Sequence, residues 1–300
     1  MTFPPDSLWT RHWRGVRLLI SGLLVVTLLG GCVIRVVYNQ LDWLALWYLE
    51  DYFELDRVQE PEAKRLIAET LSWHRTTQLP NYAALARRVL EGAETSVDAE
   101  FLAARYAEVV GLWDALLQHV APDLARLLQT LSDEQVESLF ARLAEENGEL
   151  EEDYSGVSPE ERRAKQDKEI TRAFRRFTGK LNASQEALVT GQTAQMHDLS
   201  GDWLRRRAVW QGEFRALMAG RKADPVFADR FTELVLNPNQ FDAPGYRSLV
   251  EENRQLSFRL VAEVLGKLTP AQEKHLQKSL KTYAEDFDSL VKASYSAPAG

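Results

Sequence analysis

The sequence predicts an all-α protein, an elongated array of about ten helices built from helix-turn-helix units. Apolar residues recur at spacings of three and four almost throughout the chain, as at Leu124, Leu127, Leu128 and Leu131, and this spacing is typical of amphipathic helices. No longer stretch between turn signals alternates apolar with polar side chains, so we expect no strands. The chain has 300 residues, 45% of them hydrophobic, which is enough to bury a sizeable core.

Proline, glycine and capping residues divide the chain into the expected helices. We place them near residues 33–53, 61–76, 80–92, 98–120, 122–130, 133–153, 159–180, 183–221, 225–236 and 244–293, the last interrupted around Leu268. The highly charged stretch 145–163 contains Gly148 and Gly156 and is the expected hinge within a helical domain spanning 32–293. Residues 294–300 are expected to form a disordered tail.

The N-terminal segment has the layout of a secretory signal peptide. Arg11, Arg14 and Arg17 precede an apolar run, residues 18–29, and two glycines follow it. This run is shorter than the roughly 20 apolar residues that a transmembrane helix needs. A cleaved signal peptide is therefore expected, and a short uncleaved anchor is the weaker alternative.

Leu29-Gly30-Gly31-Cys32 resembles the lipobox of bacterial lipoproteins, in which the cysteine thiol receives diacylglycerol and the preceding peptide bond is cut. The resemblance implies removal of residues 1–31 and lipidation of Cys32, the only cysteine. Two or three acyl chains, at about 0.8 kcal/mol per buried CH₂, hold a protein stably on a membrane. We expect a chain that faces the periplasm from the outer membrane, although the sequence does not separate outer from inner membrane.

Three segments share a leucine, a capping residue and a glutamine three positions after the cap. They are Leu131–Gln135, Leu181–Gln185 and Leu268–Gln272, with caps at Ser132, Asn182 and Thr269 and glutamines at Gln135, Gln185 and Gln272. In such a capping box the cap accepts from a backbone N–H, and the glutamine reaches back to the cap's own N–H. A fourth segment, Leu55–Gln59, lacks the preceding apolar pattern and is the weaker copy. The alternative is that these boxes are ordinary helix-start signals without further meaning.

The boxes resemble the LTxxQ motif of the Spy and CpxP family of periplasmic helical proteins, which act as ATP-independent chaperones or stress-signal modulators. Leu268–Gln272 matches the motif fully, whereas Ser132 and Asn182 replace its threonine in the other copies. More of the chain resembles a family of Gram-negative lipoproteins described only as a domain of unknown function. The residues that carry this second resemblance are Tyr38–Trp43, Asp51–Phe53, Trp73–Arg75 and Leu79–Tyr82.

No pattern in the sequence points to a reaction, a metal or a cofactor. His74, His119, His197 and His275 lack metal-ligand spacing, and neither HExxH nor GxSxG occurs. The formal net charge of −8 disfavours nucleic acid as a partner. Trp73-His74-Arg75 is expected to form a half-buried packing corner, with His74 near a helix C-terminal carbonyl.

The segment Val33–Phe53 is unusually aromatic. A helix that is apolar on most sides is usually buried, so the leading interpretation is a core helix with Trp43 and Trp47 inside. The alternative is a helix in the membrane interface, where tryptophan and tyrosine are favoured. Trp43, Trp47 and Tyr48 are then the candidates for membrane or partner contact.

We therefore expect a lipid-anchored periplasmic protein that binds other polypeptides, in the manner of a chaperone or assembly factor, without catalysis. The alternative is a structural lipoprotein that joins an envelope complex through one specific partner. An enzyme is the third reading. The sequence does not indicate an oligomeric state.

Overall fold

The computed structural model describes residues 32–95 and 97–296, and this part of the chain is helical without a strand, which confirms the all-α prediction. The α-helices are α2 (Cys32–Tyr38), α3 (Leu41–Phe53), α4 (Gln59–Trp73), α5 (Leu79–Ala93), α6 (Ala99–Thr130), α7 (Asp133–Ser155), α8 (Pro159–Thr178), α9 (Ala183–Thr193), α10 (Ser200–Gly220), α11 (Phe227–Leu236), α12 (Tyr246–Leu265) and α13 (Pro270–Ser296). A π-helical turn, His74–Gln78, joins α4 to α5, and a short 3-10 helix, Pro238–Phe241, follows α11. The predicted signal peptide lies outside the described residues.

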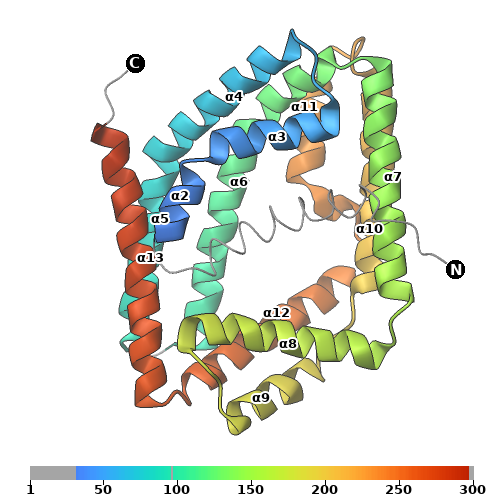
Figure 1. The fold of residues 1–300 in the computed structure, drawn as a ribbon. Coiled ribbons are helices and arrows are strands. Elements are labelled where there is room, and N and C mark those ends of the chain that lie inside the picture. The colour runs from blue at the N-terminus through green and yellow to red at the C-terminus, as the bar shows by residue number, and fades with distance from the viewer. Residues whose placement is uncertain (1–31, 96, 297–300) are drawn as a thin grey trace, which may run out of the picture.

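The helices lie along the sides of a four-sided outline (Figure 1). One side holds α3 and α4, the next α5 and α13, the third α8, α9 and α12, and the fourth α7 and α10. Helix α6 runs across this outline and packs against α4, α11 and α12. The first described helix, α2, packs against the last, α13, so the two ends of the described chain meet.

Separate hydrophobic clusters hold these sides together. The largest joins α6, α7, α10 and α11 around Leu128, Phe140, Met218 and Phe227. Others form where α2 meets α5 and α13, and where α8 and α9 meet α12. Each fully buried large side chain contributes about 1.5–3 kcal/mol relative to an exposed one. Within the described residues, no helix is both long and apolar enough to cross a membrane.

Helix α6 does not break at Pro122, so the expectation of two helices, 98–120 and 122–130, is wrong. An interior proline removes one backbone hydrogen bond and costs about 3 kcal/mol. The residues around it offset this cost, because Ala121, Ala125 and Leu128 are buried in the largest cluster. Tertiary packing therefore outweighs the local signal.

The expected single helix over 183–221 is two helices, α9 and α10, with a loop at 194–199. Asn253 of α12 fixes this loop, since its side chain accepts from the backbone N–H of His197 at 2.8 Å and donates to the His197 carbonyl at 2.9 Å. The partner lies more than fifty residues away in sequence. A local contact also marks the break, because the Asp198 carboxylate accepts from the Ser200 N–H at 3.1 Å where α10 begins.

The expected single helix over 33–53 is two helices, α2 and α3, with a turn at 39–40, and the expected break between 76 and 80 is bridged by the π-helical turn. The remaining expected boundaries shift by smaller amounts. Within the stretch 145–163, the chain leaves the helix only at 156–158, and Gly148 lies inside α7. Ser158 and Glu161 form a capping box that starts α8. Helix α13 continues to Ser296 and so includes the first residues of the expected tail.

Candidate binding surfaces

The three predicted capping boxes each contain both expected hydrogen bonds. Ser132 accepts from Gln135 N–H at 3.1 Å, and Asn182 accepts from Gln185 N–H at 3.0 Å. The reciprocal bonds, from each cap's N–H to the glutamine Oε1, measure 2.8 and 2.9 Å. Thr269 and Gln272 repeat the arrangement at the start of α13, with distances of 3.3 and 2.9 Å. These contacts account for where α7, α9 and α13 begin.

The glutamines also bond to each other in pairs. Gln185 Nε2 donates to Gln272 Oε1 at 3.0 Å, and Gln272 Nε2 donates to Gln185 Oε1 at 2.9 Å. Each amide donates once more, to a backbone carbonyl just before the partner box: Gln185 to Lys267 and Gln272 to Lys180, both at 2.9 Å. We call Gln185 and Gln272 the second glutamine pair.

The segment Leu55–Gln59, the weaker copy in the sequence, also contributes a paired glutamine. Gln59 and Gln135 exchange amide hydrogen bonds of 3.1 and 2.8 Å, and we call them the first glutamine pair. Gln59 also donates to the Thr130 carbonyl at 3.0 Å. The Asp56 carboxylate accepts from Gln59 N–H at 2.8 Å, just before α4 begins. The leucine-to-glutamine spacing and Asp56 were the signals in the sequence.

In both pairs, a glutamine at the start of one helix donates to a backbone carbonyl just before the helix that carries its partner. A buried amide without a partner costs about 1–3 kcal/mol, whereas a fully bonded one rigidifies its surroundings. Gln185 is 0% exposed, and all of its amide groups are bonded. The pairs therefore hold tertiary crossings in place, and their amides offer no group for chemistry.

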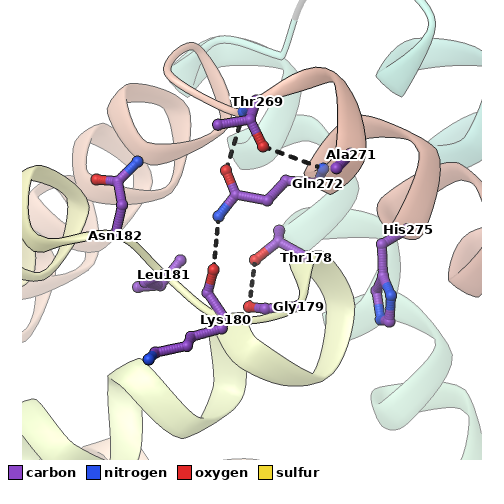
Figure 2. Close-up of a pocket in the computed structure, with 9 residues that line it drawn as sticks. All are labelled: Thr178, Gly179, Lys180, Leu181, Asn182, Thr269, Ala271, Gln272 and His275. Carbon is purple, nitrogen blue, oxygen red and sulfur yellow. Dashed lines mark hydrogen bonds between the residues drawn. The ribbon is translucent and has the colours of Figure 1, made fainter.

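An open pocket of about 510 Å³ adjoins the second glutamine pair (Figure 2). It is lined by Thr178, Gly179, Lys180, Leu181, Asn182, Thr269, Ala271, Gln272 and His275. Gly179 has a φ of 78°, a conformation that strains other residues, and a Cβ there would lie 3.8 Å from the His275 ring. At the equivalent place beside the first pair, Ser138 Oγ donates to Glu54 Oε1 at 2.6 Å.

Trp73-His74-Arg75 forms a corner with the end of α2. The Tyr38 hydroxyl and His74 Nδ1 are 2.8 Å apart, and Arg75 donates to Asn39 at 3.1 Å. His74 is half-buried, as expected, and its Nδ1 bonds to a tyrosine hydroxyl rather than to a helix C-terminal carbonyl. Burial raises the pKa of Tyr38 to about 12. Burial, then the charge of Arg75, lowers the pKa of His74.

Trp73 itself stacks on His119 of α6, with ring centroids 3.8 Å apart. This contact pins the end of α4 to α6. Within the described residues, no group of three or more histidine, cysteine, aspartate or glutamate side chains could hold a metal ion. The corner thus holds two histidines, with His74 bonded to Tyr38 and His119 stacked on Trp73.

The aromatic segment after Cys32 has two different faces. Tyr38 and Tyr52 are buried, whereas Trp43 is exposed and Trp47 half-buried. Tyr48 is at the surface and its ring lies 4.6 Å from that of Tyr52. The expectation that Trp43 lies inside the core is wrong.

Other side chains of the same helix supply the core contacts of α3. Leu46 and Leu49 pack against the cluster formed by Ala63, Leu66 and Leu127. Both lie on the side of α3 that meets α4, whereas none of the hydrophobic clusters of the described residues includes Trp43. Trp43 is consequently left on the outer surface.

Helix α6 carries the other exposed apolar surface, which the sequence reasoning missed. Tyr106, Val109, Val110 and Trp113 are 42%, 48%, 37% and 55% exposed. Their spacing of three, four and seven places them on one side of the helix, and we call this set the α6 face. At its edge the Arg254 guanidinium lies 5.0 Å from the centre of the Tyr106 ring. The same spacing indicates a core stripe in the sequence, so only the structure distinguishes the two.

A family model described as a family of unknown function, DUF6279, matches residues 51–247, more than half of the chain. The chain belongs to the DUF6279 family. In this DUF6279 protein the matched range includes the first glutamine pair and the whole α6 face, but only Gln185 of the second pair. No curated protein and no solved structure matches the chain.

Proposed function

We propose that this DUF6279 protein binds other polypeptides through the α6 face, in the manner of a chaperone or assembly factor, without catalysis. The observation that carries the proposal is the exposure of four large apolar side chains side by side on one helix. A contiguous apolar patch on a soluble protein is typical of a site that contacts another molecule. Burial of each such side chain contributes about 1.5–3 kcal/mol.

The setting of the α6 face supports the same proposal. Helix α6 is packed against α4, α11 and α12, so its exposed side is held in place before any partner arrives. A preorganised surface loses little conformational entropy on binding. Apolar segments of incompletely folded chains would bind there and leave again without ATP.

We also propose that Cys32 carries lipid and that the protein faces the periplasm, at the outer membrane. The lipobox-like residues before Cys32 support this, together with the charged and apolar regions that precede them. The variant Cys32→Ser should accumulate as a full-length precursor, because both lipid transfer and cleavage need the thiol. Normal processing of this variant, seen by mass spectrometry, would refute the lipid attachment.

Client binding is tested with the full chain and two paired variants. Val110→Ser with Trp113→Ser removes the centre of the α6 face, and Val209→Ser with Val226→Ser changes two valines that are each 49% exposed elsewhere. The wild type should suppress light scattering by several unrelated denatured proteins at near-stoichiometric ratio. The first variant should lose most of this activity and the second should keep it. Equal activity in both variants would contradict the proposal.

The alternative function, a structural lipoprotein with one partner, predicts a different result in cells. A photo-crosslinking amino acid at position 113 should capture many chains if the protein is a chaperone. Repeated capture of a single envelope protein, with no suppression of aggregation in solution, would establish the structural role instead.

A further inference from the structure

The helices nearest Cys32 expose two large apolar side chains that the core does not use. Val36 on α2 and Trp43 on α3 are each 62% exposed, more than Trp113 on the α6 face. Their neighbours Ile34 and Tyr38 are buried against Leu79 and Leu290. The segment is therefore apolar on a packed side and also at two exposed positions.

The position of the apolar run in the sequence indicates what lies next to these residues. Residues 18–29 end three positions before Cys32. If Cys32 is lipidated, acyl chains enter the bilayer there, and if the run is retained as an anchor, it enters the bilayer at the same point. Both cases place a membrane directly before α2.

Helix α2 packs directly against the rest of the protein, so no flexible linker separates that point from the folded domain. Arg35 Nε lies 3.2 Å from Asp286 Oδ1 of α13, and the Asp286 side chain is buried. Ile34 and Tyr38 pack into the cluster with Leu290. At 1.5 Å per helical residue, Val36 lies only about 6 Å along the helix from Cys32. The surface around Val36 is thus held close to the membrane.

We propose that the exposed side of α2 and α3, marked by Val36 and Trp43, rests on the phospholipid surface as a second membrane contact beside Cys32. The inference rests on the proposed membrane attachment. Tryptophan is enriched at the membrane interface, where its ring meets both apolar and polar surroundings. Asp42 and Glu50 are exposed near Trp43, and the net charge is −8. The contact therefore fits zwitterionic rather than anionic lipid.

The test uses the full chain in its own membrane with nitroxide spin labels. Trp43→Cys reports on the proposed contact, and Trp113→Cys is the matched control, since Trp113 is also an exposed tryptophan but lies on α6. The unsubstituted protein, treated with the same label, shows whether Cys32 reacts. A label at 43 should collide more with oxygen and less with a water-soluble nickel chelate than a label at 113. Equal access of the chelate to both positions would overturn the proposal.

Two further measurements separate this inference from the attachment itself. Val36→Cys gives an independent reading and should behave like Trp43→Cys. Sedimentation of the unsubstituted protein with membranes after a high-salt wash reports the attachment. A sedimenting protein with chelate-accessible positions 36 and 43 would refute the second contact and leave the attachment standing, whereas a protein that stays in the supernatant would refute both.

Discussion

The two glutamine pairs have the same hydrogen-bonding plan but different surroundings. Beside the first pair, the buried guanidinium of Arg221 donates to the Leu131 carbonyl and contacts Asp133. Beside the second, Leu181 packs in a hydrophobic cluster with Val264, and the hydroxyl of the buried Thr178 donates to the Phe174 carbonyl. The pairing thus depends on the glutamines and the backbone, while the first pair has the ion pair of Arg221 with Asp133 beside it and the second has the neutral Thr178 hydroxyl. The comparison yields four predictions.

The largest effect is expected for Gln185→Ala in the second pair. The change removes a 0% exposed side chain with both of its hydrogen bonds to Gln272, and the Lys267 carbonyl and the Asn182 N–H lose their bonds to Gln185. We expect a loss of about 3 kcal/mol in the free energy of unfolding, measured with urea. Gln192→Ala, at the surface of the same helix, is the control. A double-mutant cycle with Gln272→Ala should show strong coupling, and additive losses would refute the pairing.

A smaller but clear effect is expected for Gln59→Ala in the first pair. Gln59 is buried and bonds to Gln135, Thr130 and Asp56. The expected loss is about 2 kcal/mol, because the partner Gln135 is only half-buried and water can replace some of the lost bonds. Gln255→Ala, whose bond to Glu251 is exposed, serves as the comparison. If Gln59→Ala left the urea midpoint unchanged, Leu55–Gln59 would contribute little to stability despite its hydrogen bonds.

Replacing a capping residue should lower the free energy of unfolding less than replacing a paired glutamine. Ser132→Ala and Thr269→Ala each remove one acceptor at a helix start while the glutamine pair stays in place. Loss of an N-cap costs about 1 kcal/mol. Thermal unfolding of both variants measures the effect. If either one also abolished suppression of aggregation without lowering the midpoint, the boxes would be a binding surface rather than a structural device.

Acid should loosen the first pair before the second. The hydrogen bond from Arg221, then that from Lys222, holds the pKa of Asp133 below its usual value of 3.8. A carboxyl with a lowered pKa stabilises the fold above its unfolded value and loses that contribution as the pH falls through the folded value. Below about pH 4, hydrogen exchange of backbone amides at the start of α7 should therefore rise before exchange at the start of α13. Asp133→Asn should remove the difference.

The sequence was sufficient for the local structure of the boxes and insufficient for their pairing. Ser132 and Gln135 lie three positions apart, so a capping box can be recognised from neighbours alone. The partner of Gln135 is 76 residues away, and that of Gln185 is 87 residues away. Nothing in a single sequence links such positions. The pairing became visible only when the helices were placed together.

The two exposed apolar surfaces show the same limit of prediction from a single sequence. Tyr106, Val110 and Trp113 have the spacing of a buried helix face, and Trp43 lies in a segment apolar on most sides. Whether such a face is buried depends on whether another helix covers it. Leu46 and Leu49 have such a cover, and Trp43 does not. Sequence periodicity identifies a face but not its neighbour.

The contact between α2 and α13 has a consequence for the order in which the chain folds. The first glutamine pair can form once residue 135 has been made or exported, and the second must wait for residue 272. Helix α2 must wait longest, because Leu290 and Asp286, which hold it, belong to the final helix. Contacts between residues so far apart in the sequence form late in folding. Helix α2 consequently docks onto the protein only after α13 is present, so the two ends of the described chain come together last.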